Sequence, residues 1–437
     1  MSAPATDHPQ TSAKHSQFTS PDRPTWELYS QCIHCGLCLN HCPTYRLLGT
    51  EMDSPRGRIY QVLLADEGRL AIADSFVTHI DRCLGCRACE TACPSGVHYG
   101  RILERARTEI EKNYRRPWLS QALRRYFYTR LLRSNGKLSR AAKLLRFYQR
   151  SGLQALVRAT GLLRLLGVAD IERLAPRIDD DFFFSEFGML FPAIGERRGR
   201  VALLAGCIAS VAFSDLNRAT IRVLRQNGVE VHVPEGQRCC GALQAHGGFL
   251  EEARYNARRN LDVFLAGDFD AIVTNAAGCG ATLKEYADLL AADEAYAAKA
   301  REFVAKTRDV NEYLAAIGLR APRFKLGTKV TYQDPCHLAH GQKIRSAPRE
   351  LLEAAGAELV EMRHPDWCCG SAGTYNVVQP ELASEILKVK MDEVTETRAE
   401  VIATANVGCM LQLRAGVVQR KLPMEVKHVI ELLDKVY

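Results

Sequence analysis

The spacing of the sixteen cysteines is the feature that most constrains this chain of 437 residues. Eight of them form two copies of one pattern, with gaps of two, two and three residues and a proline after the last cysteine. The copies are Cys32, Cys35, Cys38 and Cys42 before Pro43, and Cys83, Cys86, Cys89 and Cys93 before Pro94. Three thiolates on one tight loop can surround a metal cluster, while the fourth points the other way. The pattern therefore predicts two metal centres.

This spacing is typical of two-cluster ferredoxins, in which the fourth cysteine of each run ligates the other 4Fe–4S cluster. We therefore predict two 4Fe–4S clusters with crossed ligands. One cluster is assigned to Cys32, Cys35, Cys38 and Cys93, and the other to Cys83, Cys86, Cys89 and Cys42. Zinc sites and unpaired thiols are the alternatives, but they explain neither the order of the gaps nor its repetition. Nearby arginines either offset the cluster charge or are ordinary surface residues; they are Arg56, Arg58, Arg82 and Arg87.

The other eight cysteines reveal an internal duplication. The first set is Cys207, Cys239, Cys240 and Cys279, and the second is Cys336, Cys368, Cys369 and Cys409. Corresponding cysteines are separated by 129, 129, 129 and 130 residues, and a glycine follows each adjacent pair. A register held over so many residues indicates two copies of one module.

Each copy predicts strands alternating with helices. The expected strands are 201–205, 229–233 and 270–275 in the first copy, and 329–333, 358–362 and 400–405 in the second. The expected long helices are 250–265 and 380–397. Such alternation is typical of parallel sheets in the α/β class. In each copy, all three cysteine positions fall just after the carboxyl end of an expected strand. Open parallel sheets place their binding sites at these ends.

Four thiols at one sheet edge suit a further iron–sulfur cluster or zinc in each module. A dithiol pair for thiol chemistry is the second interpretation, and plain core cysteines are the third. His246 and His337 lie near these cysteines in sequence, and each is either a donor to a bound group or a solvated loop residue.

The sequence predicts a fold that is α/β overall, in five segments. They are a disordered tail (1–25), a ferredoxin-like domain of helices and loops (26–112), a basic amphipathic helical segment and linker (113–197), and two Cys-Cys-Gly modules (198–320 and 321–437). Between Tyr114 and Arg177 the basic segment holds fifteen Lys and Arg residues and only two acidic residues. The net charge of the whole chain is +8. Charge is therefore concentrated in one region.

Several classes of protein are disfavoured. The polar N-terminus lacks the apolar core of an export signal, and no long uncharged apolar run could span a bilayer. No glycine-rich nucleotide-binding motif follows a predicted strand. We therefore expect a cytoplasmic protein, or one peripheral on the inner face of the cell membrane, without a hydride-accepting site or catalytic residue of its own.

These motifs resemble those of the glycolate oxidase (glycolate dehydrogenase) iron–sulfur subunit family. The resemblance rests on CIHCGLCLNHCPTYRLLGTEMDSPRGRIY, on DRCLGCRACETACPSGVHYGRIL and on the two Cys-Cys-Gly stretches, CCGALQAHGG and CCGSAGTYNV. It implies an electron-transfer subunit that takes electrons from a flavoprotein (FAD) subunit oxidising glycolate to glyoxylate and passes them to an acceptor such as quinone. The related modules of heterodisulfide reductase carry a fifth cysteine, whose place is taken here by Ala276 and Asn406. Five-cysteine clusters are therefore not expected.

Two other functions stay open. The chain resembles, more distantly, iron–sulfur subunits that serve D-lactate, other 2-hydroxy acids or glycerol 3-phosphate, and the substrate site lies in the flavoprotein. A zinc-containing nucleic-acid-binding protein is a remote alternative suggested by the basic segment, but no nucleic-acid-reading module is evident. For the basic segment we predict docking to an anionic membrane surface, with an acidic face of the flavoprotein or plain solvation as the alternatives.

Overall fold

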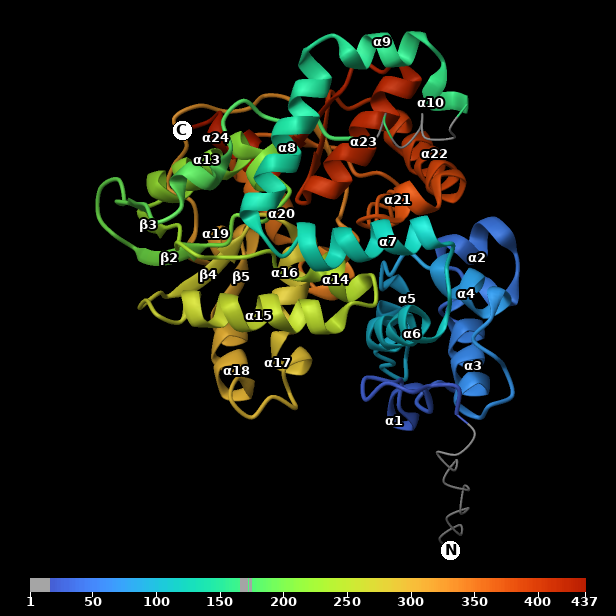
Figure 1. Ribbon diagram of the computed structural model, residues 1–437. Coiled ribbons are helices and arrows are strands. Elements are labelled where there is room, and N and C mark those ends of the chain that lie inside the picture. Colours follow the sequence, from blue (N-terminus) through green and yellow to red (C-terminus); the bar gives the residue numbers. More distant parts are fainter. Residues whose placement is uncertain (1–15, 166–171, 173–174) are drawn as a thin grey trace, which may run out of the picture. The chain divides into compact units, whose positions relative to one another are not determined.

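The computed structural model describes residues 16–165, 172 and 175–437, which divide into two compact units (Figure 1). The first unit extends to Gln121 and includes the short segment His246–Phe249. The second unit comprises Ala122–Ala245 and Leu250–Tyr437, and it contains both Cys-Cys-Gly modules. The protein therefore combines helical and mixed helix–sheet regions, as the sequence predicts.

The first unit is built from short helices and loops. Its elements are α1 (Trp26–Tyr29), α2 (Pro43–Leu48), a 3₁₀ turn (Glu51–Asp53), α3 (Pro55–Asp66), α4 (Asp74–Asp81), α5 (Ala88–Thr91) and α6 (Tyr99–Asn113). Ser54 caps α3 by accepting a hydrogen bond from the Gly57 amide, and Pro55 occupies the first turn, where no amide donor is needed. The core lies between α3, α4 and α6 and includes Phe76 and Ile102. The cysteine loops surround this small core.

The predicted disordered tail is wrong for residues 16–25, while residues 1–15 lie outside the described part of the chain. Phe18 is buried in the core of the first unit. The amides of Thr19 and Ser20 each donate to the buried carboxylate of Glu109, at 2.8 Å. Satisfying that carboxylate requires these backbone donors, because a buried charge without partners is costly.

The basic segment forms helices, as its periodicity predicts. They are α7 (Trp118–Tyr126), a π-helical turn (Phe127–Leu131), α8 (Asn135–Arg150), α9 (Leu153–Ala159) and α10 (Leu162–Leu165). Leu132 and Leu138 are buried, whereas Leu144 and Phe147 on α8 are exposed. The helices thus bury one apolar face and leave other apolar side chains at the surface.

Two sheets carry the duplicated modules. The first has the strand order β1-β3-β2-β4-β5, and the second has the order β7-β6-β8-β9. The first sheet contains β1 (Leu190–Phe191), β2 (Gly199–Leu203), β3 (Val229–His232), β4 (Ala271–Thr274) and β5 (Thr307–Asp309). The second contains β6 (Lys329–Tyr332), β7 (Glu358–Leu359), β8 (Val401–Thr404) and β9 (Glu425–His428). All pairings are parallel except that of β1 with β3.

Helices pack around these sheets. In the first module they are α12 (Ala209–Ala212), α13 (Ser214–Gln226), α14 (Ala242–His246), α15 (Leu250–Phe264), α16 (Ala277–Lys284), α17 (Tyr286–Leu289), α18 (Ala297–Lys306) and α19 (Val310–Ile317). In the second they are α20 (Ala347–Ala354), α21 (Tyr375–Val378), α22 (Pro380–Glu396), α23 (Val407–Arg420) and α24 (Val429–Asp434). A 3₁₀ turn (Phe183–Glu186) precedes the first sheet and a π-helical turn (His337–Gly341) follows β6. The predicted strands and long helices agree closely with these bounds.

Within the described residues, no helix is both long and apolar enough to cross a membrane.

Candidate metal centres

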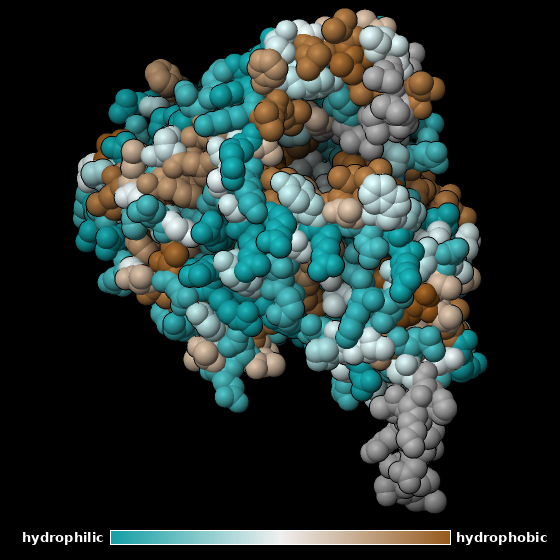
Figure 2. Space-filling view, in the orientation of Figure 1, coloured by the Kyte–Doolittle hydropathy of each residue, from teal (hydrophilic) through white to brown (hydrophobic). Residues whose placement is uncertain are grey.

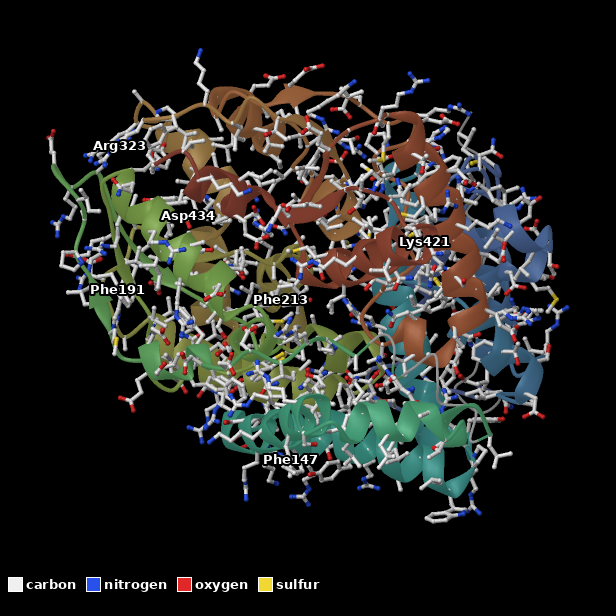
Figure 3. The ribbon with its side chains drawn as sticks, turned by 90° about the horizontal axis from the view of Figure 1, so that it is seen from above. Phe147, Phe191, Phe213, Arg323, Lys421 and Asp434 are labelled. Atoms are coloured by element: carbon white, nitrogen blue, oxygen red, sulfur yellow. The ribbon has the colours of Figure 1, made fainter. Side chains whose placement is uncertain are left out.

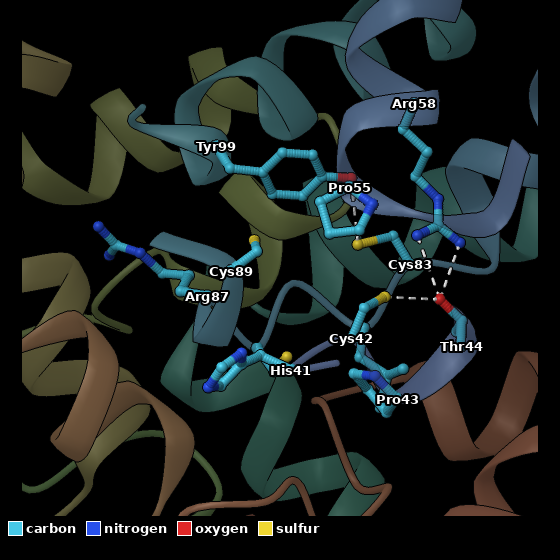
Figure 4. A pocket seen from close by; sticks show the side chains of 12 residues that line it. His41, Cys42, Pro43, Thr44, Pro55, Arg58, Cys83, Arg87, Cys89 and Tyr99 are labelled. Carbon is cyan, nitrogen blue, oxygen red and sulfur yellow. Dashed lines mark hydrogen bonds between the residues drawn. The ribbon is translucent and has the colours of Figure 1, made fainter. Parts of the chain in front are cut away.

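The second cysteine run of the first unit lines a small pocket (Figure 4). Four cysteines line it: Cys83, Cys86 and Cys89 of that run, and Cys42 of the other run. The carboxyl end of the first run leads directly into α2, and this turn carries Cys42 away from its own run. The thiolates of Cys86, Cys83 and Cys42 stand close enough to Cys89 to add to the effect of burial, which raises its pKa well above the ordinary value.

Hydrogen-bond donors surround the sulfurs of this pocket. The Tyr99 hydroxyl donates to Cys83 Sγ at 3.5 Å (Figure 4). The Gly85 amide donates to the same sulfur at 3.4 Å. The Thr44 hydroxyl also lies 3.2 Å from Cys42 Sγ, but it donates its proton to the Asp53 carbonyl at 2.8 Å. Donors to sulfur are one of the means by which a protein sets the potential of an iron–sulfur site.

Arg58 brings a positive charge to the same pocket. Its guanidinium is 1% exposed, donates to Thr44 Oγ1 at 3.1 Å through both terminal nitrogens, and pairs with Asp53 at 3.3 Å. Burial alone would lower the pKa of Arg58. The nearby groups of Cys83, Tyr99, Cys42 and Asp53 raise it by more, so the pKa of Arg58 lies above its ordinary value. Arg58 is therefore part of the pocket and not an ordinary surface arginine.

The first cysteine run is more open. Cys35 is exposed, and Cys32, Cys38 and Cys93 are half-buried. Burial raises the pKa of Cys32, and the neighbouring Cys93 and Cys35 raise it as well, which places Cys93 beside the run to which it does not belong. Burial raises the pKa of Cys38 to about 11.

Arg56 fixes the loop of this first run. Its Nη1 donates to the carbonyl of His34 at 3.0 Å, while its Nε pairs with Glu51 at 2.7 Å. His34 is therefore a loop residue held through its backbone. Arg82 pairs with Asp53 at 3.2 Å and Arg87 pairs with Glu90 at 2.9 Å, so both stabilise the fold around the cysteine loops.

In the first Cys-Cys-Gly module the cysteines meet beyond the carboxyl ends of the central strands. Cys207 follows β2, the adjacent pair follows β3, and Cys279 lies in the first turn of α16, after β4. Cys207 Sγ lies 3.4 Å from Cys239 Sγ, and hydrogen bonds continue from Cys239 to Cys240 and from Cys240 to Cys279. The hydrogen bond with Cys239 and burial raise the pKa of Cys207 well above its usual value.

The second module repeats this arrangement. Cys336 follows β6, and its side chain is hydrogen-bonded to Cys368. Cys369 is hydrogen-bonded to Cys368 and to Cys409, in the first turn of α23. Each predicted set of four is thus brought together.

The glycine after each cysteine pair allows the pair to lie against a helix. Gly241 and Gly370 have φ values of +88° and +91°, in the region that side chains rarely adopt. A Cβ on Gly241 would lie 3.1 Å from Ala253 Cα of α15, and one on Gly370 would lie 2.6 Å from the Ala383 carbonyl oxygen of α22. The close approach therefore requires glycine at both places.

The residues near the thiols offer partners to a sulfur-ligated group. Across the described residues, no group of three or more His, Cys, Asp or Glu side chains is arranged to hold one metal ion. The sulfurs around Arg58 line one pocket. In the first module, the Gln244 Nε2 is buried without a hydrogen-bond partner, and the same side chain's Oε1 lies 3.8 Å from Cys239 Sγ. Such an unpartnered donor suits a sulfur acceptor.

Several residues near these sites have roles that the sequence did not reveal. Lys390 of α22 is buried and donates to the carbonyl of His364 at 2.6 Å, in the loop before Cys368. Asn260 of α15 serves the corresponding loop, accepting from the Arg238 amide at 2.8 Å and donating to the Cys239 carbonyl at 3.2 Å. Of the two histidines near the module cysteines in sequence, His246 pairs with Glu104 at 2.7 Å within the first unit, and His337 begins the π-helical turn after Cys336.

Comparisons with known proteins agree with this organisation. The 4Fe-4S dicluster domain family matches residues 29–97, and the cysteine-rich domain family matches residues 201–284 and 330–414. A third family, described as the linker region of the glycolate oxidase iron–sulfur subunit, matches residues 119–175. The dicluster and cysteine-rich domains mark this chain as an iron–sulfur protein.

Whole-chain relatives specify the family. The chain is 38% identical over 410 residues to the probable glycolate oxidase iron–sulfur subunit of Bacillus subtilis strain 168, covering 92% of each chain. It is 34% identical over 410 residues to the glycolate oxidase iron–sulfur subunit of Escherichia coli strain K12, covering 92% of this chain and 93% of that one. Lactate utilization protein A of Oceanobacillus iheyensis is 27% identical over 237 residues, which is 54% of this chain and 96% of that protein. The protein therefore belongs to the glycolate oxidase iron–sulfur subunit family.

Proposed function

We propose that this chain is the electron-transfer subunit of a glycolate-oxidising complex. It would receive electrons from a flavoprotein subunit and pass them to an acceptor such as quinone. The pocket formed by Cys42 with Cys83, Cys86 and Cys89 is the observation that carries the proposal, because it joins cysteines of both runs. A 4Fe–4S cluster, when bound, accepts and releases one electron at a time.

The residues of the first unit suit two different tasks. Arg58 offers positive charge and Tyr99 offers a hydrogen bond to a group in the buried pocket, and Thr44 holds the Arg58 guanidinium in place. The open site has the exposed apolar side chains of Ile33 and Leu37 beside Cys35. A partner can reach this loop, so we assign electron exchange with another protein to it.

Serine substitution of the fourth cysteines tests the crossed ligands. We expect Cys93→Ser to alter the EPR signal of the open site, assigned to Cys32, Cys35 and Cys38. Cys42→Ser should alter the signal of the buried pocket. The reverse pattern would overturn the crossed arrangement, and iron analysis gives the number of groups: about eight irons per chain correspond to two cubanes alone.

The substrate is tested in the complex with its flavoprotein partner. We expect glycolate to reduce the iron–sulfur signals faster than D-lactate or glycerol 3-phosphate does, because the match to the glycolate oxidase linker family covers residues 119–175. Faster reduction by D-lactate would favour the alternative that the shorter match to lactate utilization proteins suggests. A colourless protein that holds zinc would contradict the whole proposal.

We also propose that α8 and α9 contact an anionic bilayer. Residues 114–169 contain no Asp or Glu. The side chains of Leu144, Phe147 and Leu156 are exposed on these helices, as are those of Arg140 and Lys143. Hydrophobic side chains lie over α9 in Figure 2, and Phe147 is labelled on α8 in Figure 3. Apolar groups with flanking cations are typical of an interfacial helix, and each basic residue contributes about 1 kcal/mol near an acidic surface.

Vesicle sedimentation separates this surface from the rest of the basic segment. Replacing Arg140 and Lys143 with Gln, together with Leu144→Ser and Phe147→Ser, should abolish binding to vesicles that contain anionic lipid. Arg133→Gln is the matched control, because Arg133 stacks 3.6 Å above the Tyr255 ring and pairs with Glu252. Equal binding to neutral vesicles would exclude this role for the surface.

A further inference from the structure

The two cysteine sets of the second unit adjoin where the modules meet. The Ala277 amide, at the start of α16, donates to the Ala405 carbonyl just beyond β8, at 3.2 Å. His428 Nε2, at the end of β9, lies 2.9 Å from the Asn275 carbonyl just beyond β4. The segments that lead to Cys279 and Cys409 are therefore in direct contact.

One side chain touches both cysteine-bearing turns. Asn406 Nδ2 donates to Cys409 Sγ at 3.4 Å, and its Oδ1 accepts from the Gly278 amide, which precedes Cys279, at 3.3 Å. The same amide group thus contacts a sulfur of the second module and the backbone of the first.

The local structure shows that the Asn406 side chain does not cap its own helix. Asn406 occupies the N-cap position of α23, where asparagine is a preferred residue, yet its side chain makes no capping hydrogen bond. Ala276 occupies the corresponding position before α16, and that helix forms without any capping side chain. The asparagine is therefore used across the module contact, and only one module carries it.

We propose that the two cysteine sets form one bimodular site, and that Asn406 is the positioning residue that joins its halves. This inference rests on the proposed binding of iron–sulfur groups by these cysteines. Donation from Nδ2 to Cys409 raises the potential of a group held by the second module, since hydrogen bonds to sulfur tune such potentials. The hydrogen bond that Oδ1 accepts from the Gly278 amide fixes the turn that carries Cys279. A shift of Asn406 therefore moves the cysteine-bearing turns of both modules.

Two substitutions in the full-length chain separate the contacts. Asn406→Leu keeps the approximate volume and removes both hydrogen bonds. Asn406→Asp keeps the acceptor for the Gly278 amide and removes the donor to Cys409. Thr404→Val is the matched control, because it removes the hydrogen bond from Thr404 Oγ1 to Gln333, which touches no cysteine.

The readout is redox-titrated EPR, with iron and sulfide analysis, after Cys279→Ser and Cys409→Ser have assigned the signals of the two modules. Asn406→Leu should shift the second module's signal to lower potential and also change the line shape of the first module's signal. Asn406→Asp should shift the second signal and leave the first unchanged. A change confined to the second module in Asn406→Leu would overturn the bimodular site.

A second measurement keeps the test independent of the proposed function. If the wild-type chain holds iron in the first unit and none at the eight module cysteines, the proposed metal binding by the modules fails. Alkylation followed by mass spectrometry then tests the joint site directly. Asn406→Leu should speed modification of both Cys279 and Cys409 several-fold relative to Thr404→Val, whereas a faster reaction at Cys409 alone would overturn the inference.

Discussion

The two Cys-Cys-Gly modules have the same arrangement of strands and thiols but different buried polar groups. In the first module the loop before the cysteine pair is held by the neutral Asn260, and in the second it is held by Lys390 with Glu393. The last strand of the first sheet ends at Asp309, and that of the second ends at His428; each side chain caps the helix that follows. The repeated backbone therefore fixes the thiols, while the buried groups give each module its own electrostatics.

Removing the buried lysine should have the largest effect. Lys390→Met removes the buried ammonium that donates to the His364 carbonyl and interacts electrostatically with Glu393, so we expect a loss of about 3–5 kcal/mol in the second module. Asn260→Leu in the first module removes neutral hydrogen bonds and should cost about 1–3 kcal/mol. Hydrogen exchange of peptides from α22 and α15, measured in urea, compares the two. Equal losses would mean that the charges of Lys390 and Glu393 do not distinguish the modules.

Acid should affect the modules in opposite directions. Burial lowers the pKa of His428 to about 4, and His428 Nδ1 accepts from the Ile430 amide, as a neutral ring does. The contribution of neutral His428 to the free energy of unfolding is complete above pH 6.5. About 3 kcal/mol of it is lost as the pH falls to 4. Burial raises the pKa of Asp309 to about 6, so its contribution is complete below pH 3.8 and is lost as the pH rises through 6.

Asparagine variants isolate the pH dependence of stability that His428 and Asp309 each cause. Between pH 6.5 and 4, His428→Asn should lose less stability than the wild type. Asp309→Asn should gain stability relative to the wild type as the pH rises from 4 to 6. Chemical unfolding across this range, followed by hydrogen exchange in each module, measures both effects. If the free energies of unfolding of both variants changed with pH as that of the wild type does, the opposite effects of His428 and Asp309 would be refuted.

The smallest expected difference concerns the glycines. Gly241→Ala and Gly370→Ala both place a side chain at positive φ, which costs about 1–2 kcal/mol. Gly370→Ala should cost more, because its Cβ would lie 2.6 Å from a backbone oxygen. Gly318→Ala is the control for strain alone, since nothing lies within 4 Å of its Cβ. Thermal unfolding should rank the three as Gly370, Gly241 and Gly318, from most to least destabilised.

The sequence predicted the sheets well because their central strands are continuous apolar runs. β4 and β8 are buried along their whole length and were expected within about two residues of their observed ends. The edge strands β5 and β9 were missed because they are short and consist mainly of polar residues. Composition also could not show that Phe18 is buried or that Glu109 requires backbone donors from a distant segment.

The cysteine positions were equally predictable, since they follow the ends of those strands. The surroundings of the thiols were not, because they depend on contacts between distant elements. Lys390 fits the pattern of an ordinary long helix, and nothing in its neighbours indicates that it is buried. Arg58 was recognised as a neighbour of the cysteines, but only the fold places it beside Thr44 and Asp53.

The one-sided contact of Asn406 between the modules has a consequence for how such a site can arise. A dimer of identical subunits with two-fold symmetry must carry the same residue on both sides of its axis. Here Asn406 faces a backbone whose own equivalent position is Ala276. Fusion of two copies in one polypeptide removes the symmetry constraint, so one half can evolve a polar contact without imposing it on the other. The covalent link thereby permits a directional site that a homodimer of this module could not build.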